Sequence, residues 1–238
     1  MQNTKGSDPV LVIDGVVGCG KTTLAKILED ELKMKLYEEI GSQDTINLLD
    51  RFYAKRTRWG FTLQIHFLNT RFRQIKDIHA NGGGMLDRSI FGDRLFAEMM
   101  AEDLEDGGEG MTWEEFRTYS TLLDSMLEHA IPPTLLVYLE CDVDTAIGRI
   151  AKRDRGLESG VERGYWERLN DKYTEWYGKY DASPKIKINV AELDYVNNEE
   201  DRAEVVQIVK DALKEIDLAN QIKALEATID AKTQEVAK

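Results

Sequence analysis

The sequence predicts an α/β protein in which a five-stranded parallel sheet is covered by helices on both faces. Short apolar runs recur along the chain, and each is long enough for a buried strand. Longer segments with helical periodicity separate these runs, as parallel strands joined by crossover helices require. The expected strands are residues 10–14, 35–38, 84–87, 134–140 and 185–190.

Helices are expected between and after these strands, and several begin at recognisable signals. Thr112 and Glu115 have the spacing of a capping box, and Asn198 precedes an acidic first turn. Glycines at 82–84 and prolines at 132–133 each precede a strand and end the segment before it. The helices are expected to begin near Lys21, Asp44, Gly60, Ile90, Thr112, Val143, Glu162 and Asn198.

The composition indicates one folded domain, because 42 % of the 238 residues are hydrophobic, enough for one substantial core. We expect it to span residues 10–217, after a disordered N-terminal tail at 1–9 and before a helical extension at 218–238. In the extension, a heptad-like apolar stripe interrupted by Lys232 comprises Leu218, Ile222, Leu225, Ile229 and Val236. The stripe fits a helix that packs on its own domain or frays, or alternatively one that associates with another chain.

The charge balance limits the possible partners. Against 44 acidic side chains there are 31 basic ones, which gives a formal net charge of −13 and argues against binding to nucleic acid or to a membrane surface. An anionic substrate would need a local basic pocket. Cys19 and Cys141 form no CxxC motif, which is typical of a reduced cytoplasmic protein. No stretch approaches the roughly 20 apolar residues of a membrane span.

A phosphate-binding loop directly follows the first expected strand. Residues 15–22 read GVVGCGKT, which matches G-x-x-x-x-G-K-[ST] in the strand, loop and helix context that this motif requires. The glycines let successive backbone amides surround a phosphate, Lys21 can reach the β- and γ-phosphates, and the Thr22 hydroxyl can bind Mg²⁺. The expected nucleotide-binding residues here are Gly15, Val16, Val17, Gly18, Cys19, Gly20, Lys21, Thr22 and Thr23.

The residues after the third expected strand favour phosphoryl transfer to a small molecule. Asp87 can provide a carboxylate to Mg²⁺, and Arg88 can provide a guanidinium to the transferring phosphoryl group. No N-K-x-D motif for a guanine base follows, as a GTPase would need. Further along, Arg149, Arg153 and Arg155 predict an arginine-rich lid at residues 149–162, and the alternative is a solvated, salt-bridged helix end.

Three longer strings resemble the deoxynucleoside kinase family, in particular its bacterial deoxyadenosine and deoxyguanosine kinases. They are DRSIFGDRLF at 87–96, the R-x-x-x-R-x-R string at 149–155 and YDASPK at 180–185. The resemblance covers residues 10–218 and implies a P-loop kinase fold. It also implies ATP-dependent, Mg²⁺-dependent phosphorylation of the 5′-hydroxyl of a purine deoxynucleoside in nucleotide salvage. Helices at 61–80 and 112–130 correspond to the dimer interface of that family, so a homodimer is implied.

The resemblance also implies roles for single residues. Glu38 matches the general base on the 5′-hydroxyl, and Glu39 is the alternative. Tyr53 matches the tyrosine on the sugar 3′-hydroxyl, Trp59 is expected to line the pocket, and Gln64 matches the amide that pairs with the base.

Other positions match the base pocket, the lid and the donor site. Arg71 and Asp93 resemble an Arg/Asp pair beside the base in purine- and cytidine-directed members, and Glu158 matches a lid glutamate on the 3′-hydroxyl. Asp194 and Tyr195 resemble a loop beside the donor adenine. Catalytic roles are implied for Lys21, Arg88, Arg149 and Arg153.

Two alternatives to this function are kept open by the sequence. A nucleoside monophosphate kinase of the thymidylate kinase type shares the phosphate loop, an Asp-Arg strand end and an arginine lid, but its acceptor already carries a phosphate. A non-catalytic nucleotide-binding protein could use the C-terminal helix to recruit a partner. The presence of Lys21, Thr22, Asp87 and Arg88 argues against the second alternative.

Overall fold

A computed structural model describes residues 9–153 and 161–236 of the chain. Its centre is a five-stranded sheet with the order β2-β3-β1-β4-β5, in which every neighbouring pair is parallel. The strands are β1 Val10–Gly15, β2 Leu36–Tyr37, β3 Gly84–Asp87, β4 Leu135–Glu140 and β5 Lys185–Asn189. The sheet confirms the predicted fold class, and each expected strand exists with ends shifted by at most one residue.

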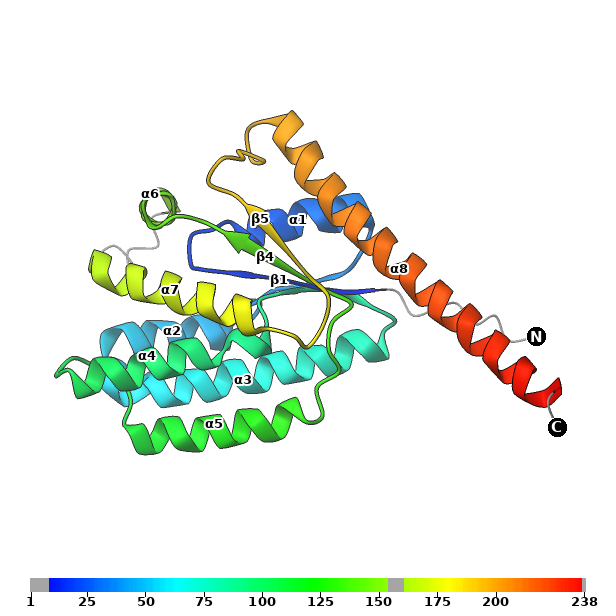
Figure 1. Ribbon diagram of the computed structural model, residues 1–238. Coiled ribbons are helices and arrows are strands. Elements are labelled where there is room, and N and C mark those ends of the chain that lie inside the picture. Colours follow the sequence, from blue (N-terminus) through cyan, green and yellow to red (C-terminus); the bar gives the residue numbers. More distant parts are fainter. Residues whose placement is uncertain (1–8, 154–160, 237–238) are drawn as a thin grey trace.

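Helices connect and cover these strands (Figure 1). They are α1 Lys21–Leu32, α2 Gln43–Ala54, α3 Arg56–Ala80, the 3-10 helix η1 Ile90–Gly92, α4 Arg94–Glu105, α5 Trp113–Leu127, α6 Val143–Arg153, α7 Arg163–Lys179 and α8 Glu199–Val236. The capping box of Thr112 and Glu115 is present at the start of α5. Two starts differ from expectation, because α3 begins before Gly60 and the segment at Ile90 is a single 3-10 turn before α4.

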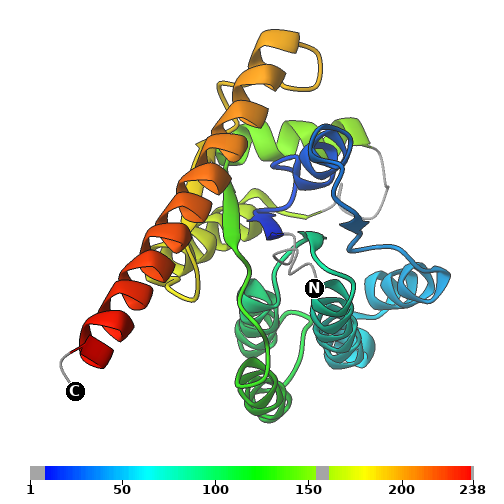
Figure 2. The ribbon, with the colours of Figure 1, turned by 90° about the vertical axis from the view of Figure 1, so that its right-hand side faces the viewer.

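Alternate residues of the central strand face two separate hydrophobic clusters, as the twofold side-chain period of a strand dictates. Leu11 and Ile13 pack with residues of α1, α7 and α8 on one side of the sheet. Val10 and Val12 pack with residues of α3, α4 and α5 on the other side. Helices therefore cover both faces, as Figure 1 and the perpendicular view in Figure 2 show.

Strand β1 also decides where a site can form. The chain leaves β1 for β2 and β3 on one side and reaches β4 and β5 on the other, so the direction of the connections reverses at β1. In open α/β sheets, ligands bind beyond the carboxyl ends of the strands at such a switch point. Here these ends carry Asp14 and Gly15 of β1 and Asp87 of β3.

The last helix, α8, has two different halves. Val205, Val206 and Val209 are buried against the sheet cluster, whereas every residue from 217 to 233 is exposed. The helix passes residue 217 without a break and projects away from the body in Figures 1 and 2. The expectation that this stripe packs on its own domain is therefore wrong, because no part of the sheet or its covering helices extends that far. No helix in the described residues is apolar over the length that a bilayer span needs.

Candidate active site

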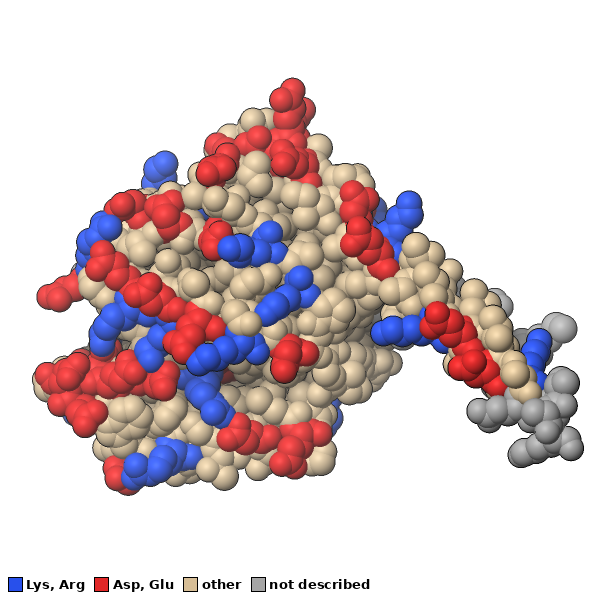
Figure 3. Space-filling model, in the orientation of Figure 1, with Lys and Arg blue, Asp and Glu red and all other residues tan. Residues whose placement is uncertain are grey.

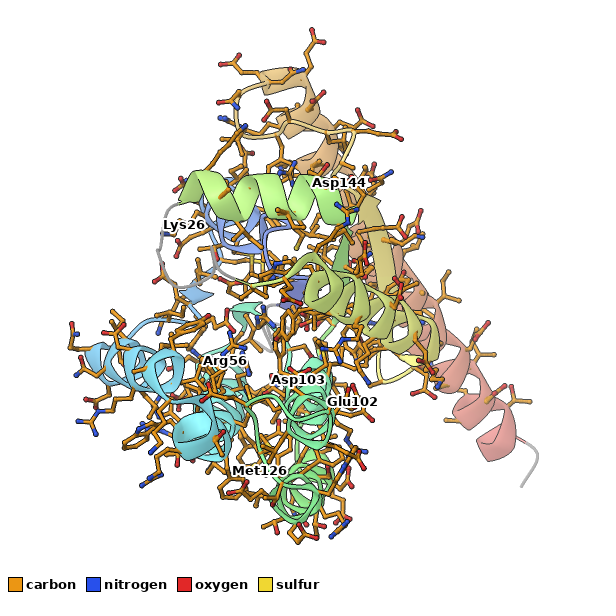
Figure 4. All side chains as sticks on the ribbon, turned by 90° about the vertical axis from the view of Figure 1, so that its left-hand side faces the viewer. Lys26, Arg56, Glu102, Asp103, Met126 and Asp144 are labelled. Atoms are coloured by element: carbon orange, nitrogen blue, oxygen red, sulfur yellow. The ribbon has the colours of Figure 1, made fainter. Side chains whose placement is uncertain are left out.

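A cleft of about 1080 Å³ opens at the carboxyl ends of β1 and β3. In Figure 4, Lys26 of α1 marks one side of this cleft, and Arg56 of α3 and Asp103 of α4 mark the other. Both the phosphate loop and the segment that resembles a deoxynucleoside pocket contribute to its walls. Among the expected nucleotide-binding residues, those that line it are Val17, Gly18, Gly20, Lys21, Thr22, Thr23, Arg149, Asp194 and Tyr195.

The phosphate loop needs glycine for its backbone conformation and for its close neighbours. Gly18 has a φ of 84° and Gly20 a φ of 100°, in the left-handed region that side chains disfavour. A Cβ on Gly18 would lie 2.5 Å from the carbonyl oxygen of Ala146, and one on Gly20 would lie 2.0 Å from the Tyr195 hydroxyl. The remaining loop residues do not line the cleft, because Gly15, Val16 and Cys19 are buried in the protein interior. Burial raises the pKa of the Cys19 thiol.

Arg149 and Tyr195 hold the loop from behind. The Arg149 guanidinium donates to the Cys19 carbonyl at 3.2 Å and to the Val190 carbonyl at 2.8 Å. The buried Tyr195 hydroxyl lies 3.2 Å from both the Cys19 and the Gly20 carbonyl oxygens. The structure thus brings both residues to the loop, whereas the neighbouring Asp194 carboxylate is exposed and accepts hydrogen bonds from Asn197.

Lys21 and the pair of Thr22 and Asp87 lie at the base of the cleft. The Lys21 ammonium donates to the carbonyls of Gly15 and Val16 at 2.9 Å each. The Thr22 hydroxyl donates to Asp87 Oδ2 at 2.7 Å. The other carboxylate oxygen, Asp87 Oδ1, is buried and has no hydrogen-bond partner in the described part of the chain.

A hydroxyl and a half-paired carboxylate suit a hard cation such as Mg²⁺, which prefers oxygen ligands and retains water. Burial, and then the nearby Glu39 carboxylate, raise the pKa of Asp87, and a cation there would favour its charged form. No group of three or more His, Cys, Asp or Glu side chains arranged for a metal exists in the described residues. The remaining ligands would therefore have to come from phosphate and water.

Glu39 lies between two arginines at the centre of the cleft. Its Oε1 is 2.8 Å from Arg88 Nε and accepts a hydrogen bond from Arg71 Nη2 at 2.6 Å. Burial alone would raise the pKa of Glu39, but the charges of Arg88, Arg71 and Lys21 outweigh it, so the pKa is lowered. Arg88 itself has a φ of 87°, a strained backbone conformation of the kind found at functional positions. Its Nη1 donates to the buried Tyr173 hydroxyl at 2.8 Å.

Glu38, which the resemblance favours as the base, is placed differently. Its carboxylate is 43 % exposed and lies 3.3 Å from the Lys26 ammonium at the rim, and its backbone carbonyl accepts from Gln74. Only 20 % of the Glu39 side chain is exposed. Both side chains line the cleft, but Glu39 is held at its centre by two arginines, whereas Glu38 lies at the rim beside Lys26 of α1. The geometry favours Glu39, the alternative residue, over Glu38.

Gln64, Arg71 and Asp93 form the polar end of the acceptor side. Gln64 and Arg71 are seven residues apart on α3, so both reach the cleft from one helical face, and both are buried. Arg71 Nη1 forms an ion pair with Asp93 Oδ1. Asp93 Oδ2 and Arg71 Nε are buried without a hydrogen-bond partner in the described residues. Burial raises the pKa of Asp93 to about 6, and Arg71 partly offsets that rise.

Two aromatic residues of this region have different positions. Tyr53 lines the cleft, as expected, but Trp59 does not. The Trp59 ring lies between the guanidinium groups of Arg51 and Arg58, at 5.0 and 4.4 Å. Trp59 precedes Gln64 by five residues, which on an α-helix rotates it by about 140° away from the cleft face. The assignment of Trp59 to the pocket is therefore corrected.

Two residues of the site were missed by the sequence interpretation. Asp14 is buried, and its carboxylate accepts from the backbone amides of Gly15 at 2.8 Å and Ser89 at 3.0 Å, so it ties the phosphate loop to the segment after β3. Its acidic type at the end of an apolar strand was an available signal. Tyr173 shares one face of α7 with the buried Trp166 and Leu169, a pattern that marks it as buried but not as a partner of Arg88. The side chain of Arg153 and all of Arg155 and Glu158 lie outside the described residues.

These contacts define a P-loop phosphotransferase. One side of the cleft provides the glycine loop, a lysine and a cation-binding pair for a nucleotide, and the other provides a carboxylate between arginines for an acceptor. The deoxynucleoside kinase family model matches residues 11–214. The chain belongs to the deoxynucleoside kinase family and is a phosphotransferase, which confirms the resemblance derived from its sequence.

Named relatives and solved structures agree with this assignment. The chain is 39 % identical to the deoxyguanosine kinase of Lactobacillus johnsonii, a match that covers 87 % of this chain and 93 % of that protein. It is 36 % identical to the deoxyadenosine/deoxycytidine kinase of Bacillus subtilis, with coverage of 80 % and 86 %. The structure of deoxyadenosine kinase from M. mycoides with bound dCTP is similar with a TM-score of 0.70, at 25 % identity and with coverage of 86 % and 98 %.

Proposed function

We propose that this enzyme transfers the γ-phosphate of ATP to the 5′-hydroxyl of a purine deoxynucleoside, deoxyadenosine or deoxyguanosine. The observation that carries the proposal is Glu39, held between Arg71 and Arg88 in the same cleft as the phosphate loop. Relatives named deoxyguanosine kinase and deoxyadenosine kinase support the substrate class. The product, a deoxynucleoside monophosphate, would enter cytoplasmic nucleotide salvage as a DNA precursor.

On the donor side, the loop amides and Lys21 bind the phosphates of ATP. Thr22 and Asp87 would hold Mg²⁺, which when bound offsets the charge on the β- and γ-phosphate oxygens. Arg149 supports the loop carbonyl at Cys19, close to where those phosphates lie. Arg153 and Arg155 would add cations from the lid, and Glu158 would reach the sugar 3′-hydroxyl. The loop that contains Asp194 and Tyr195 would lie beside the adenine, while the Tyr195 hydroxyl supports the phosphate loop.

On the acceptor side, Glu39 accepts the proton of the 5′-hydroxyl while Arg88 contacts the transferring phosphoryl group. A base with a lowered pKa is adequate here, because phosphoryl transfer has a loose transition state and needs little proton abstraction before bond formation. The lowered pKa also keeps Glu39 ionised at neutral pH. Tyr53, at the wall of the cleft, would contact the sugar 3′-hydroxyl.

The base is recognised by Gln64, Arg71 and Asp93. A purine presents both donors and acceptors at its edge, and an amide offers one of each in a plane. Asp93 Oδ2 and Arg71 Nε, which have no protein partner in the described residues, supply a further acceptor and donor. Leaving such groups unpaired in a buried site is costly, so a base that satisfies them is favoured over one that does not.

The proposal includes a homodimer built on α3 and α5. These two long helices pack against each other and lie on the same side of the sheet in Figure 1, and Leu122 of α5 is an exposed large apolar residue. Their correspondence with the family's dimer helices is the other support. In sedimentation, the enzyme with Leu122→Asp should have about half the mass of the wild type at the same concentration.

The direct test of the function is a substrate panel with ATP and Mg²⁺. The four deoxynucleosides and their four monophosphates are compared, and the enzyme is expected to consume a purine deoxynucleoside with the highest kcat/KM. Faster turnover of a monophosphate would instead indicate the nucleoside monophosphate kinase alternative. Absence of ATP consumption with all eight compounds would indicate a non-catalytic protein.

A further inference from the structure

The projecting half of α8 carries an apolar surface that the catalytic function does not use. Leu218, Ile222, Leu225 and Ile229 are 57, 48, 63 and 61 % exposed, and they lie along one stripe of the helix. We call these four residues the α8 stripe. In Figure 3 the same half of the helix shows uncharged surface between bands of charged side chains. Single exposed apolar residues are ordinary, but a continuous stripe marks an interaction surface.

The residue types on the α8 stripe favour pairing with one further helix. Their spacing of four, three and four residues places Leu218 and Leu225 at heptad position d and Ile222 and Ile229 at position a. Apolar residues confined to positions a and d form the narrow seam of a coiled coil, not the wider apolar face of a helix that packs on a globular body. The occupant of the stripe is therefore a single helix with the same periodicity, and the chain carries one such helix itself.

Charged residues at both ends of the stripe determine the orientation of a second copy. Glu215 occupies the heptad position before Leu218, and Lys232 the one after Ile229. In a parallel pair, Glu215 would face Glu215 and Lys232 would face Lys232. In an antiparallel pair with Ile222 opposite Leu225, Leu218 faces Ile229 and Glu215 faces Lys232. Every residue of the α8 stripe still faces an apolar residue, and each contact between like charges in the parallel pair is replaced by a contact between opposite charges.

We propose that the projecting halves of α8 from two copies of this chain pair antiparallel through the α8 stripe. The inference does not depend on the catalytic function. The pairing joins two bodies at opposite ends of the paired segment. The face of α8 that packs on its own body, around Val205 and Val209, differs from the stripe, so the stripe remains accessible where the helix leaves the body.

The polar side chains beside the α8 stripe already form hydrogen bonds within their own helix. The hydroxyls of Thr228 and Thr233 donate to the carbonyls of Ala224 and Ile229 at 2.8 and 2.9 Å within the helix. The Gln221 amide donates to the Asp217 carboxylate at 2.8 Å. A second helix can therefore approach without leaving these donors unsatisfied.

The first test measures the mass of the full-length enzyme by sedimentation over a wide concentration range. The chain with Ile222→Asp and Leu225→Asp is expected to retain the dimer of α3 and α5 but to have about half the mass of the wild type at high concentration, because the symmetric α8 pairing between such dimers is lost. Lys223→Glu, at heptad position b outside the α8 stripe, is the control and should match the wild type. All variants should keep wild-type turnover per chain, because no stripe residue lines the cleft.

The second test exchanges the two end charges. Glu215→Lys or Lys232→Glu alone creates like-charge contacts, and each should raise the dissociation constant about three- to tenfold. The double exchange should restore the wild-type constant, whereas Asp230→Lys should have little effect. The proposal is overturned if the double variant associates no better than the single ones. It is equally overturned if the wild type has the mass of the Asp variant at every concentration, which would assign the stripe to a different partner.

A cross-linking experiment tests the register. Chains with Ile222→Cys mixed with chains with Leu225→Cys should form a disulfide-linked pair under mild oxidation, whereas either variant alone should cross-link much less. Cross-linking of each variant with itself, and none in the mixture, would support a parallel pair and contradict the proposal. The two native cysteines are buried and do not interfere.

Discussion

The donor and acceptor sides of the cleft are built in opposite ways. The phosphate loop is one contiguous segment whose backbone provides the binding groups, with side chains added by its own Lys21 and Thr22. The acceptor side is assembled from side chains of distant segments, with Glu39, Arg71 and Asp93 in contact although they lie up to 54 positions apart. A backbone site tolerates few changes in conformation, whereas a side-chain site depends on the balance of buried charges.

The largest effect is expected on the donor side. Lys21→Ala should lower kcat by about 10³, because the variant loses the cation that reaches the β- and γ-phosphates. Lys26→Ala, at the rim of the cleft and 59 % exposed, is the matched control and should stay within about twofold of the wild type. Equal losses of kcat in both variants would show that Lys21 contributes no more to catalysis than a lysine at the rim of the cleft. Circular dichroism and thermal melting verify that both variants fold.

On the acceptor side, the two adjacent glutamates should behave very differently. Glu39→Gln should reduce kcat by about 10², because the amide cannot accept the proton of the 5′-hydroxyl. Glu38→Gln should change kcat by no more than about twofold, since it alters only a surface ion pair with Lys26. Steady-state kinetics with deoxyadenosine and deoxyguanosine measure both. The opposite ranking would restore Glu38 as the base.

The acceptor side should also respond to pH through the carboxyl group of Asp93. Burial raises the pKa of Asp93 from 3.8 to about 6, so its carboxyl gains a proton as pH falls through 6 and its ion pair with Arg71 weakens. The KM for the deoxynucleoside should therefore rise about three- to tenfold between pH 7 and pH 5. Glu39 stays ionised over this range because its pKa is lowered. In Asp93→Asn the pH dependence of the nucleoside KM should disappear.

Protonation of Asp93 weakens substrate binding, but the same protonation stabilises the folded state. A carboxyl with a raised pKa binds more protons in the folded than in the unfolded state between about pH 4 and 6. Asp93 therefore contributes to the stability of the fold on the acid side of 6 and loses this contribution as pH rises through 6. Melting temperatures of the wild type and Asp93→Asn across this range should diverge at low pH, in favour of the wild type. Parallel curves would contradict the raised pKa.

The smallest effect is expected at Trp59. Because its ring lies outside the cleft between Arg51 and Arg58, Trp59→Ala should leave both KM values within about twofold. Loss of the two cation–π contacts should cost about 1 to 2 kcal/mol of stability, which a thermal melt detects. Phe67→Ala is the comparison, since this ring lines the cleft beneath Arg71 and its loss should raise the nucleoside KM. A large KM change in Trp59→Ala alone would restore its assignment to the pocket.

The sequence predicted the donor side better than the acceptor side for a physical reason. The loop from Gly15 to Thr22 carries its own context, because strand, turn and helix follow one another without interruption. The sequence does not show which of Glu38 and Glu39 points into the cleft. Strand β2 has only two residues, too few for an alternation of apolar and polar side chains that would determine it. Trp59 could have been excluded by helical phase against Gln64, but only if the start of α3 had been placed at Arg56.

The fold itself was predicted almost completely, because hydrophobic periodicity determines the order of strands and helices. Tertiary features such as the unusual backbone of Arg88 and the contact of Tyr173 with it arise from packing between distant segments. No local pattern encodes them. Likewise, the sequence does not show that α8 projects into solvent beyond residue 217, because this depends on how far the sheet and its covering helices extend.

The tyrosine behind the phosphate loop has a consequence for how a nucleotide is received. The oxygens of Cys19 and Gly20 are directed toward the Tyr195 hydroxyl, and in a planar trans peptide the following N–H points the opposite way. The amides of Gly20 and Lys21 are thus oriented by a residue from the far end of the chain. These amides therefore need little reorientation when ATP binds. Tyr195→Phe, although distant in sequence, would lower phosphate affinity in the same way as a change in the loop itself.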